Sequence, residues 1–184
     1  MKPSLGVMLL CVSIAGGTRV GATVLPDACG RDEIRFKVTT EKGRPAPAAP
    51  EAGKAQIVFV ETIDKDWTGT CIGCNVLTRV GVDGAWVGAN KGVSYFAYTV
   101  EPGEHHLCAN WQSVLGSTGK DIGVASFVAE PGKVYYFQVA ITMKQWSVDG
   151  FIHSENRLDL KQLSDDEGRY LVKVSPLSAA IAKE

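Results

Sequence analysis

The chain has 184 residues, which suits a single domain. Hydrophobic residues make up 45 % of it and charged residues 21 %, and its 20 glycines and 8 prolines are typical of a turn-rich globular protein, which argues against disorder and coiled coil. The 19 basic residues nearly balance the 20 acidic ones. This balance argues against binding to nucleic acid or to an anionic membrane surface, because proteins that bind them are strongly basic.

Residues 1–22 have the features of a signal peptide. Lys2 precedes an apolar run from Leu5 to Gly17, and the small residues at 20–22 form a signal-peptidase site. The run is shorter than the roughly 20 residues that a transmembrane helix needs. We therefore expect an exported protein, periplasmic or at the cell surface, whose mature chain starts at Thr23 and has no transmembrane segment. The alternative is an uncleaved anchor in the membrane interface.

Cysteines favour disulfides in the mature chain. Once Cys11 leaves with the signal peptide, four of the five cysteines remain, and an even number in an exported protein favours two bridges. Cys71 and Cys74 flank a tight turn with glycine at its third position, which can bring them within bridging distance. We expect this pair to be bridged, and Cys29 to join Cys108 and so tie the N-terminal arm to a central strand.

The Cys-x-x-Cys pattern at Cys71 and Cys74 has two other interpretations. A thiol redox site would place the first cysteine at a helix N-terminus, but the residues that follow are strand-like. A zinc site could recruit His105 or His106 together with Cys108. An oxidising compartment favours the structural disulfide over both alternatives.

Hydrophobic periodicity predicts an all-β domain, a small antiparallel sandwich or open barrel, over residues 54–184. Residues 23–53 read as an N-terminal arm with one strand at 34–40 and a linker rich in proline and alanine. The other expected strands cover residues 54–62, 76–82, 85–88, 93–100, 105–111, 122–129 and 134–143. One or two short helices follow, one capped at Ser164 with Glu167 three residues later, and another over residues 177–182.

Three turns punctuate the strands. Asp83-Gly84 between two valine-rich runs is a strong signal for a two-residue hairpin. Pro102-Gly103 and Pro131-Gly132 each follow a glutamate and place proline and glycine where a type II turn needs them. We expect these two to close two hairpins of the same build.

Four segments carry a resemblance to a known family: Gly53–Glu61, Arg79–Gly88, Tyr95–Leu107 and Glu130–Val139. They resemble the Domain of Unknown Function 2846 family, bacterial envelope proteins whose β-domain is similar to the PEGA-type sandwich. The resemblance covers about residues 53–145 and implies an exported β-domain without assigned catalytic residues. Many members of that family are lipoproteins, whereas neither Cys11 nor Cys29 here follows the small residues that a lipid-attachment site needs.

Apart from the two alternatives at Cys71 and Cys74, no pattern in the sequence indicates catalysis, a metal or a cofactor. On a strand His105 and His106 point to opposite faces, so they cannot share a metal without a bulge. The chain has no Gly-x-Ser-x-Gly elbow for a nucleophile, and His153 reads as a surface residue. We therefore expect no enzyme.

A binding module remains the main functional alternative to a purely structural one. Aromatic side chains on neighbouring strands suit a glycan or a peptide, and the candidate ligand face consists of Trp86, Tyr95, Tyr98 and Trp111. Core packing is the competing explanation for these side chains. We expect an exported, non-catalytic structural or binding module whose partner is an envelope protein or a glycan.

Overall fold

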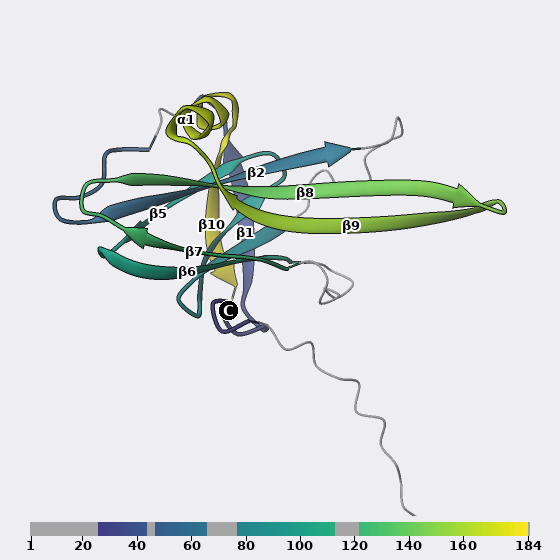
Figure 1. The fold of residues 1–184 in the computed structure, drawn as a ribbon, viewed down its shortest axis with the longest axis horizontal. Coiled ribbons are helices and arrows are strands. Elements are labelled where there is room, and N and C mark those ends of the chain that lie inside the picture. Colours follow the sequence, from purple (N-terminus) through teal and green to yellow (C-terminus); the bar gives the residue numbers. More distant parts are fainter. Residues whose placement is uncertain (1–25, 44–46, 66–76, 113–121, 184) are drawn as a thin grey trace, which may run out of the picture.

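The computed structural model describes residues 26–43, 47–65, 77–112 and 122–183, which form ten strands and one helix (Figure 1). The expected signal peptide and the Cys71 and Cys74 pair lie outside the described residues. The elements are β1 (Arg35–Glu41), β2 (Ala55–Lys65), β3 (Leu77–Val82), β4 (Ala85–Lys91), β5 (Tyr95–Val100), β6 (Gly103–Trp111), β7 (Ile122–Ala129), β8 (Val134–Val148), β9 (Phe151–Gln162), α1 (Asp165–Val174) and β10 (Leu177–Lys183).

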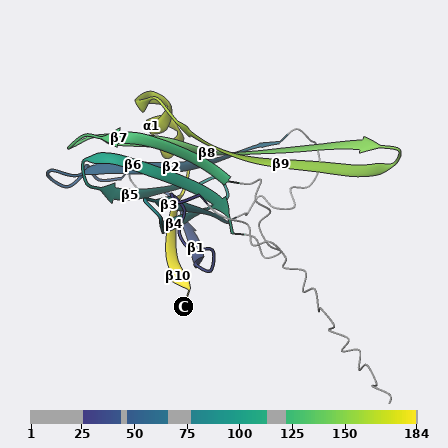
Figure 2. The ribbon, with the colours of Figure 1, turned by 60° about the horizontal axis from the view of Figure 1, so that its bottom comes forward.

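The strands form two sheets that pack against each other. The six-stranded sheet has the order β1-β10-β5-β2-β8-β9, and the four-stranded sheet has the order β4-β3-β6-β7. Strand β1, which the sequence places in the N-terminal arm, belongs to the six-stranded sheet. Together with β10 it runs steeply across the other strands (Figure 2). The predicted all-β, sandwich-like fold is confirmed.

The main core fills the space between the sheets. Ile57 and Phe59 of β2 meet Val80 of β3 and Leu107 of β6 there, and all four side chains are fully buried. The alternate residues of β2 face the other way and pack beneath α1, as the pleat of a strand requires. A third cluster covers the outer face of the four-stranded sheet beneath the N-terminal segment.

Helix α1 begins with the capping box that the sequence predicts. The Ser164 hydroxyl accepts from the Glu167 amide, and the Glu167 carboxylate accepts from the Ser164 amide. The helix lies on the outer face of the six-stranded sheet (Figure 1). Gly168 permits this contact, because a Cβ there would lie 2.0 Å from Cγ of Tyr136.

The second C-terminal helix expected over residues 177–182 is a strand instead. Seven residues of β10 pair antiparallel with β1, from Leu177 opposite Glu41 to Lys183 opposite Arg35. Pro176 removes one backbone donor just before this segment, and its alanines are small enough to lie on the sheet. Here tertiary pairing overrides the helix propensity of alanine.

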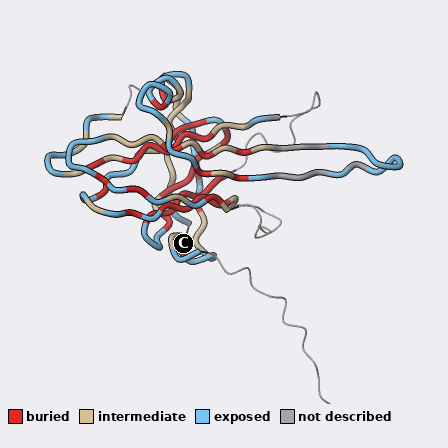
Figure 3. The backbone as a smooth tube through the Cα atoms, viewed as in Figure 1, coloured by how far each residue is buried: buried red, intermediate tan, exposed pale blue. Residues whose placement is uncertain are grey.

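Strands β8 and β9 form a long hairpin that the sequence analysis missed beyond residue 145. It closes at Asp149-Gly150, where φ is 50° and 79°, as a type I′ turn requires. The distal half of the hairpin projects away from both sheets (Figures 1 and 2). The described residues near the turn are exposed (Figure 3).

The Asp83-Gly84 turn joins β3 and β4 as a hairpin, as predicted. The two Pro-Gly turns do not close hairpins. Pro102-Gly103 leads from β5 in the six-stranded sheet to β6 in the four-stranded sheet, and the turn after Glu130 leads back from β7 to β8. The turn residues specify a chain reversal, but they leave open which strand lies next to the returning chain.

Candidate functional site

The N-terminal segment crosses the outer face of the four-stranded sheet. We call residues 26–34 the N-terminal strap. A disulfide joins Cys29 of the strap to Cys108 of β6, with the two Cα atoms 5.2 Å apart, which confirms the predicted pairing. Gly30 lets the strap approach closely, because a Cβ there would lie 2.5 Å from the backbone nitrogen of Trp86.

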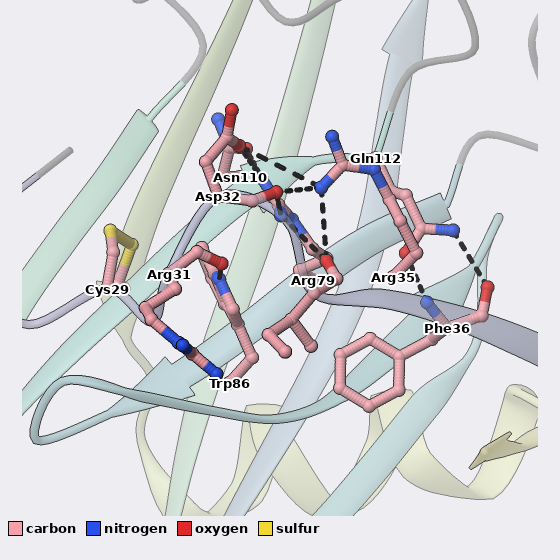
Figure 4. Close-up of polar contacts among 11 residues, drawn as sticks. Cys29, Arg31, Asp32, Arg35, Phe36, Arg79, Trp86, Asn110 and Gln112 are labelled. Carbon is pink, nitrogen blue, oxygen red and sulfur yellow. Dashed lines mark hydrogen bonds and ion pairs between the residues drawn. A yellow bond between two sulfur atoms is a disulfide. The ribbon is translucent and has the colours of Figure 1, made fainter. Parts of the chain in front are cut away.

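Arg79 of β3 lies beneath the strap with its side chain only 1 % exposed (Figure 4). Its guanidinium donates to the backbone oxygens of Asp32 and Ile34, each at 2.9 Å. It also donates to the Asp32 carboxylate at 3.0 Å and to the Asn110 side-chain oxygen at 2.5 Å. The ring of Trp86 lies 4.4 Å away, in cation–π range. Burial lowers the pKa of Arg79, but these acceptors keep the guanidinium charged.

The strap and β1 are fastened at two further points. The Trp86 indole donates to the backbone oxygen of Arg31 at 2.9 Å. The Gln112 side-chain amide accepts from the Phe36 amide at 2.6 Å and donates to its carbonyl at 2.8 Å, so it substitutes for a neighbouring strand (Figure 4). The disulfide, the guanidinium and these contacts together hold the strap on the sheet.

A groove of about 810 Å³ lies between the strap and the outer faces of β6 and β7. Its lining includes Asp27 and Asp83 as hydrogen-bond acceptors, His106, and the half-exposed Val124.

His105 lies at the sandwich end that carries the Pro-Gly turns. Its Nδ1 donates to the Asp83 carboxylate at 2.6 Å, and its Nε2 donates to the Glu101 carbonyl at 2.7 Å. Burial alone would lower the pKa of His105, but the two acceptors outweigh it and raise the pKa above the ordinary value. Burial would likewise raise the pKa of Asp83, and hydrogen bonds from His106 and His105 lower it instead. The pair links the β3–β4 turn to the β5–β6 turn.

Glu61 lies at the other end of the sandwich interior. It follows Phe59 on the inward face of β2 and is fully buried. Burial raises its pKa to about 8, although the nearby Thr78 hydroxyl counters the shift in part. Within the described residues neither carboxyl oxygen has a partner in hydrogen-bonding geometry, and neither does Oδ1 of Asn90, the residue opposite Thr78 in the β3–β4 register.

The tip of the β8–β9 hairpin exposes apolar side chains on one face. Trp146 pairs with His153 and Val148 with Phe151 in the antiparallel register, so all four side chains share that face. The rings of Trp146 and His153 stack 5.8 Å apart. Phe151 is 73 % exposed, Val148 is 49 % exposed and Trp146 is 46 % exposed. We call these four residues the tip face.

The structure distributes the four residues of the predicted ligand face over different environments. Trp86 lies beneath the strap and Tyr95 beneath α1, and both are buried. Trp111 is half-buried against the main core, and Tyr98 is 37 % exposed on β5. The four side chains therefore do not gather on one surface.

The structure bears only in part on the alternative thiol and zinc interpretations, because Cys71 and Cys74 lie outside the described residues. Cys108 is bonded to Cys29 and has no thiolate to offer a metal. His105 points inward to Asp83 and His106 is exposed, as the strand alternation predicted. Among the described residues, no group of three or more histidine, cysteine or acidic side chains is arranged to hold a metal ion.

The sequence analysis missed Arg79, Glu61 and the tip face. A signal for each was present: an arginine and a glutamate interrupt valine-rich strand runs, and Val148-Asp149-Gly150 repeats the tripeptide of the predicted hairpin at Val82.

No family model, curated protein or solved structure matches this chain. In the described part of the chain, no helix has the length and apolar character to cross a membrane.

Proposed function

We propose that this protein is an exported, disulfide-braced module of the cell envelope that acts by binding another envelope component rather than by catalysis. The tip face is the observation that carries the proposal. Aromatic side chains of this kind dominate binding energy at protein interfaces.

The core clusters contain none of the four tip-face side chains. The hydrophobic core ends near Ile141 and Leu158, whereas the tip face lies further out on the projecting hairpin. Exposing a tryptophan and a phenylalanine there costs solubility, and such a patch is typical of an interaction surface. An envelope protein with a complementary apolar site fits this surface; a glycan stacked on Trp146 is the second possibility.

Export is supported by the disulfide. A bond between Cys29 and Cys108 persists in an oxidising compartment and is rare in the cytosol. The expected signal peptide agrees with that location. The intact mass of protein recovered from the host envelope tests export and signal cleavage. A mass equal to that of residues 23–184 supports export, and retention of residues 1–22 contradicts signal cleavage.

Photo-crosslinking in living cells tests the binding role. A photoreactive phenylalanine replaces Trp146 or Phe151, and the matched control replaces Tyr170, which is 65 % exposed on α1. We expect adducts with one or more envelope components from the tip positions and not from position 170. Equal labelling at all three positions, or none at the tip, would contradict the proposal.

A further inference from the structure

Strand β9 leaves part of one edge without a neighbour. It is the last strand of the six-stranded sheet, and no other described strand pairs with its outer edge. Near the body, β7 packs against this edge: a Cβ at Gly123 would lie 2.8 Å from the backbone nitrogen of Leu160 and from Cδ2 of Leu158. The open part of the edge therefore runs from Phe151 to Arg157.

The hairpin turn determines which backbone groups face outward. In a two-residue hairpin the closing pair, here Val148 and Phe151, is hydrogen-bonded across the two strands. Hydrogen-bonded pairs alternate along the ladder, so the amides and carbonyls of residues 152, 154 and 156 point away from β8. They form a regular row of three donors and three acceptors with which no described strand pairs.

This edge lacks three of the features that often block strand addition. Residues 151–157 contain no proline and no lysine, and the β8–β9 register runs without a bulge from the turn to Gln162. Its charged residues, Glu155 and Arg157, have opposite signs. A projecting and regular edge is a template for another strand.

The edge is complementary to itself. In an antiparallel pair of two copies centred on Ser154, position 152 lies opposite 156 of the second copy, so all outward groups of both strands meet. The same register places Phe151, 73 % exposed, beside Arg157 of the second copy, whose side chain is 71 % exposed. A guanidinium beside an aromatic ring is a favourable contact. Position 153, a histidine, lies opposite position 155, a glutamate.

We infer that the protein forms a two-fold symmetric dimer through antiparallel pairing of residues 151–157 of β9 with the same residues of a second copy. The two hairpins then form a continuous four-stranded ribbon. Directly opposite residues in such a ribbon share a face, so both tip faces lie on the same side. The dimer therefore presents two tip faces at once, which raises the avidity for any repeated partner.

A lipid surface fits this hairpin less well. Asp149 forms the outermost turn together with Gly150, so insertion of the tip would bury a carboxylate in the membrane. The near-neutral composition also offers little attraction to anionic lipid. The dimer extends the proposed binding function but does not depend on it, since edge pairing uses backbone groups and not the apolar side chains of Trp146 and Val148.

Sedimentation velocity on the purified mature protein over a range of concentrations tests the dimer. We expect a monomer–dimer equilibrium that Ser154→Pro weakens about 10-fold or more, because proline removes a central donor from each copy. The Ser154 amide points away from β8, so proline there leaves the hairpin itself intact. Tyr170→Ser, on α1, is the control and should leave the equilibrium unchanged.

A charge exchange tests the register. His153→Asp places an aspartate opposite Glu155 of the second copy and should weaken the dimer, and adding Glu155→Lys should restore it. A monomer at all concentrations overturns the inference, and a dimer unaffected by Ser154→Pro assigns the interface to another surface and overturns it too. Neither of these results decides the photo-crosslinking experiment, which tests binding to another envelope component. The binding proposal and the dimer can therefore fail independently.

Discussion

Arg79 and Glu61 are two fully buried ionisable side chains in the same sandwich, with opposite surroundings. Arg79, on the outer face of β3, has four hydrogen bonds and an aromatic ring. Glu61, on the inner face of β2, has no partner in hydrogen-bonding geometry for either carboxyl oxygen among the described residues. Arg79 therefore remains charged, whereas Glu61 is neutral below its raised pKa of about 8.

The contrast shows that burial alone does not determine the charge of a group. Desolvation acts on both side chains, and the supply of acceptors or donors decides which form is stable. The strap supplies acceptors to Arg79 from backbone and carboxylate oxygens. Among the described residues, the inner end near Glu61 offers its carboxyl oxygens no group in hydrogen-bonding geometry, so protonation is the way to remove the charge.

The largest effect is expected from Glu61→Gln at alkaline pH. The pKa of Glu61 rises from 4.5 to about 8 on folding, so the folded protein binds more protons than the unfolded chain between these values. Stability therefore falls as pH rises through this window, by up to about 5 kcal/mol at about 1.4 kcal/mol per pKa unit. Urea unfolding at pH 5, 7 and 9 should show this fall in the parent protein and its loss in the variant. Equal slopes in both proteins would contradict a buried, neutral Glu61.

Arg79→Lys should cost about 3 kcal/mol, because one ammonium group cannot reach all the acceptors that the guanidinium fork serves. Arg35→Lys is the matched control, since the Arg35 side chain is 39 % exposed at the rim of the same network. Urea unfolding at neutral pH compares the two. If Arg79→Lys lowers the free energy of unfolding no more than Arg35→Lys does, the guanidinium of Arg79 is not needed to hold the strap.

His105 is an intermediate case, because it is buried but has an acceptor at each ring nitrogen. His105→Gln should cost about 2 kcal/mol below pH 6.5. The pKa of His105 is raised on folding, so its contribution is complete below the ordinary value and is lost as pH rises through the raised one. His106→Gln, with a side chain 60 % exposed, is the control. An NMR titration that places the pKa of His105 below 6.5 would contradict the double hydrogen bond.

The smallest effect on stability is expected at the tip face. Trp146→Ser and Phe151→Ser should each change the free energy of unfolding by less than about 1 kcal/mol, because neither side chain belongs to the core and each loses at most a cross-strand contact. Leu158→Ala, near the base of the same hairpin and buried in the core, should cost about 3 kcal/mol. A large loss from either tip variant would give the tip face a structural role.

Local chemistry predicted much of this fold. The Asp83-Gly84 hairpin and the Ser164 capping box follow from turn and cap residues that act within a few positions. Most strand positions follow from hydrophobic periodicity along the chain. The Cys29–Cys108 bond followed from cysteine arithmetic, with the partner of each cysteine chosen by turn geometry. These features depend on neighbours in sequence or on a very small number of possible pairings.

Features that depend on distant pairing were the ones missed. The strand at Leu177–Lys183 exists because β1 lies beside it. The Pro102-Gly103 turn changes sheets because β2 lies next to β5 and β3 next to β6. The turn after Glu130 does so because β8 pairs with β2 and β9. Glu61 has the strand parity of Ile57 and Phe59, so its inward direction could have been predicted. Its lack of a partner could not, because that depends on side chains contributed by the opposite sheet.

The Cys29–Cys108 bond also constrains the route by which the chain oxidises. Cys71 and Cys74 lie between its two ends in sequence, so thiols that pair in the order of synthesis would join Cys29 to Cys71 first. The native bond then requires either thiol–disulfide exchange or a sheet that forms before oxidation and brings residue 108 to the strap. Oxidative folding of this protein therefore has to select the native pairing among several possible thiol pairs, and we expect a disulfide isomerase to accelerate it.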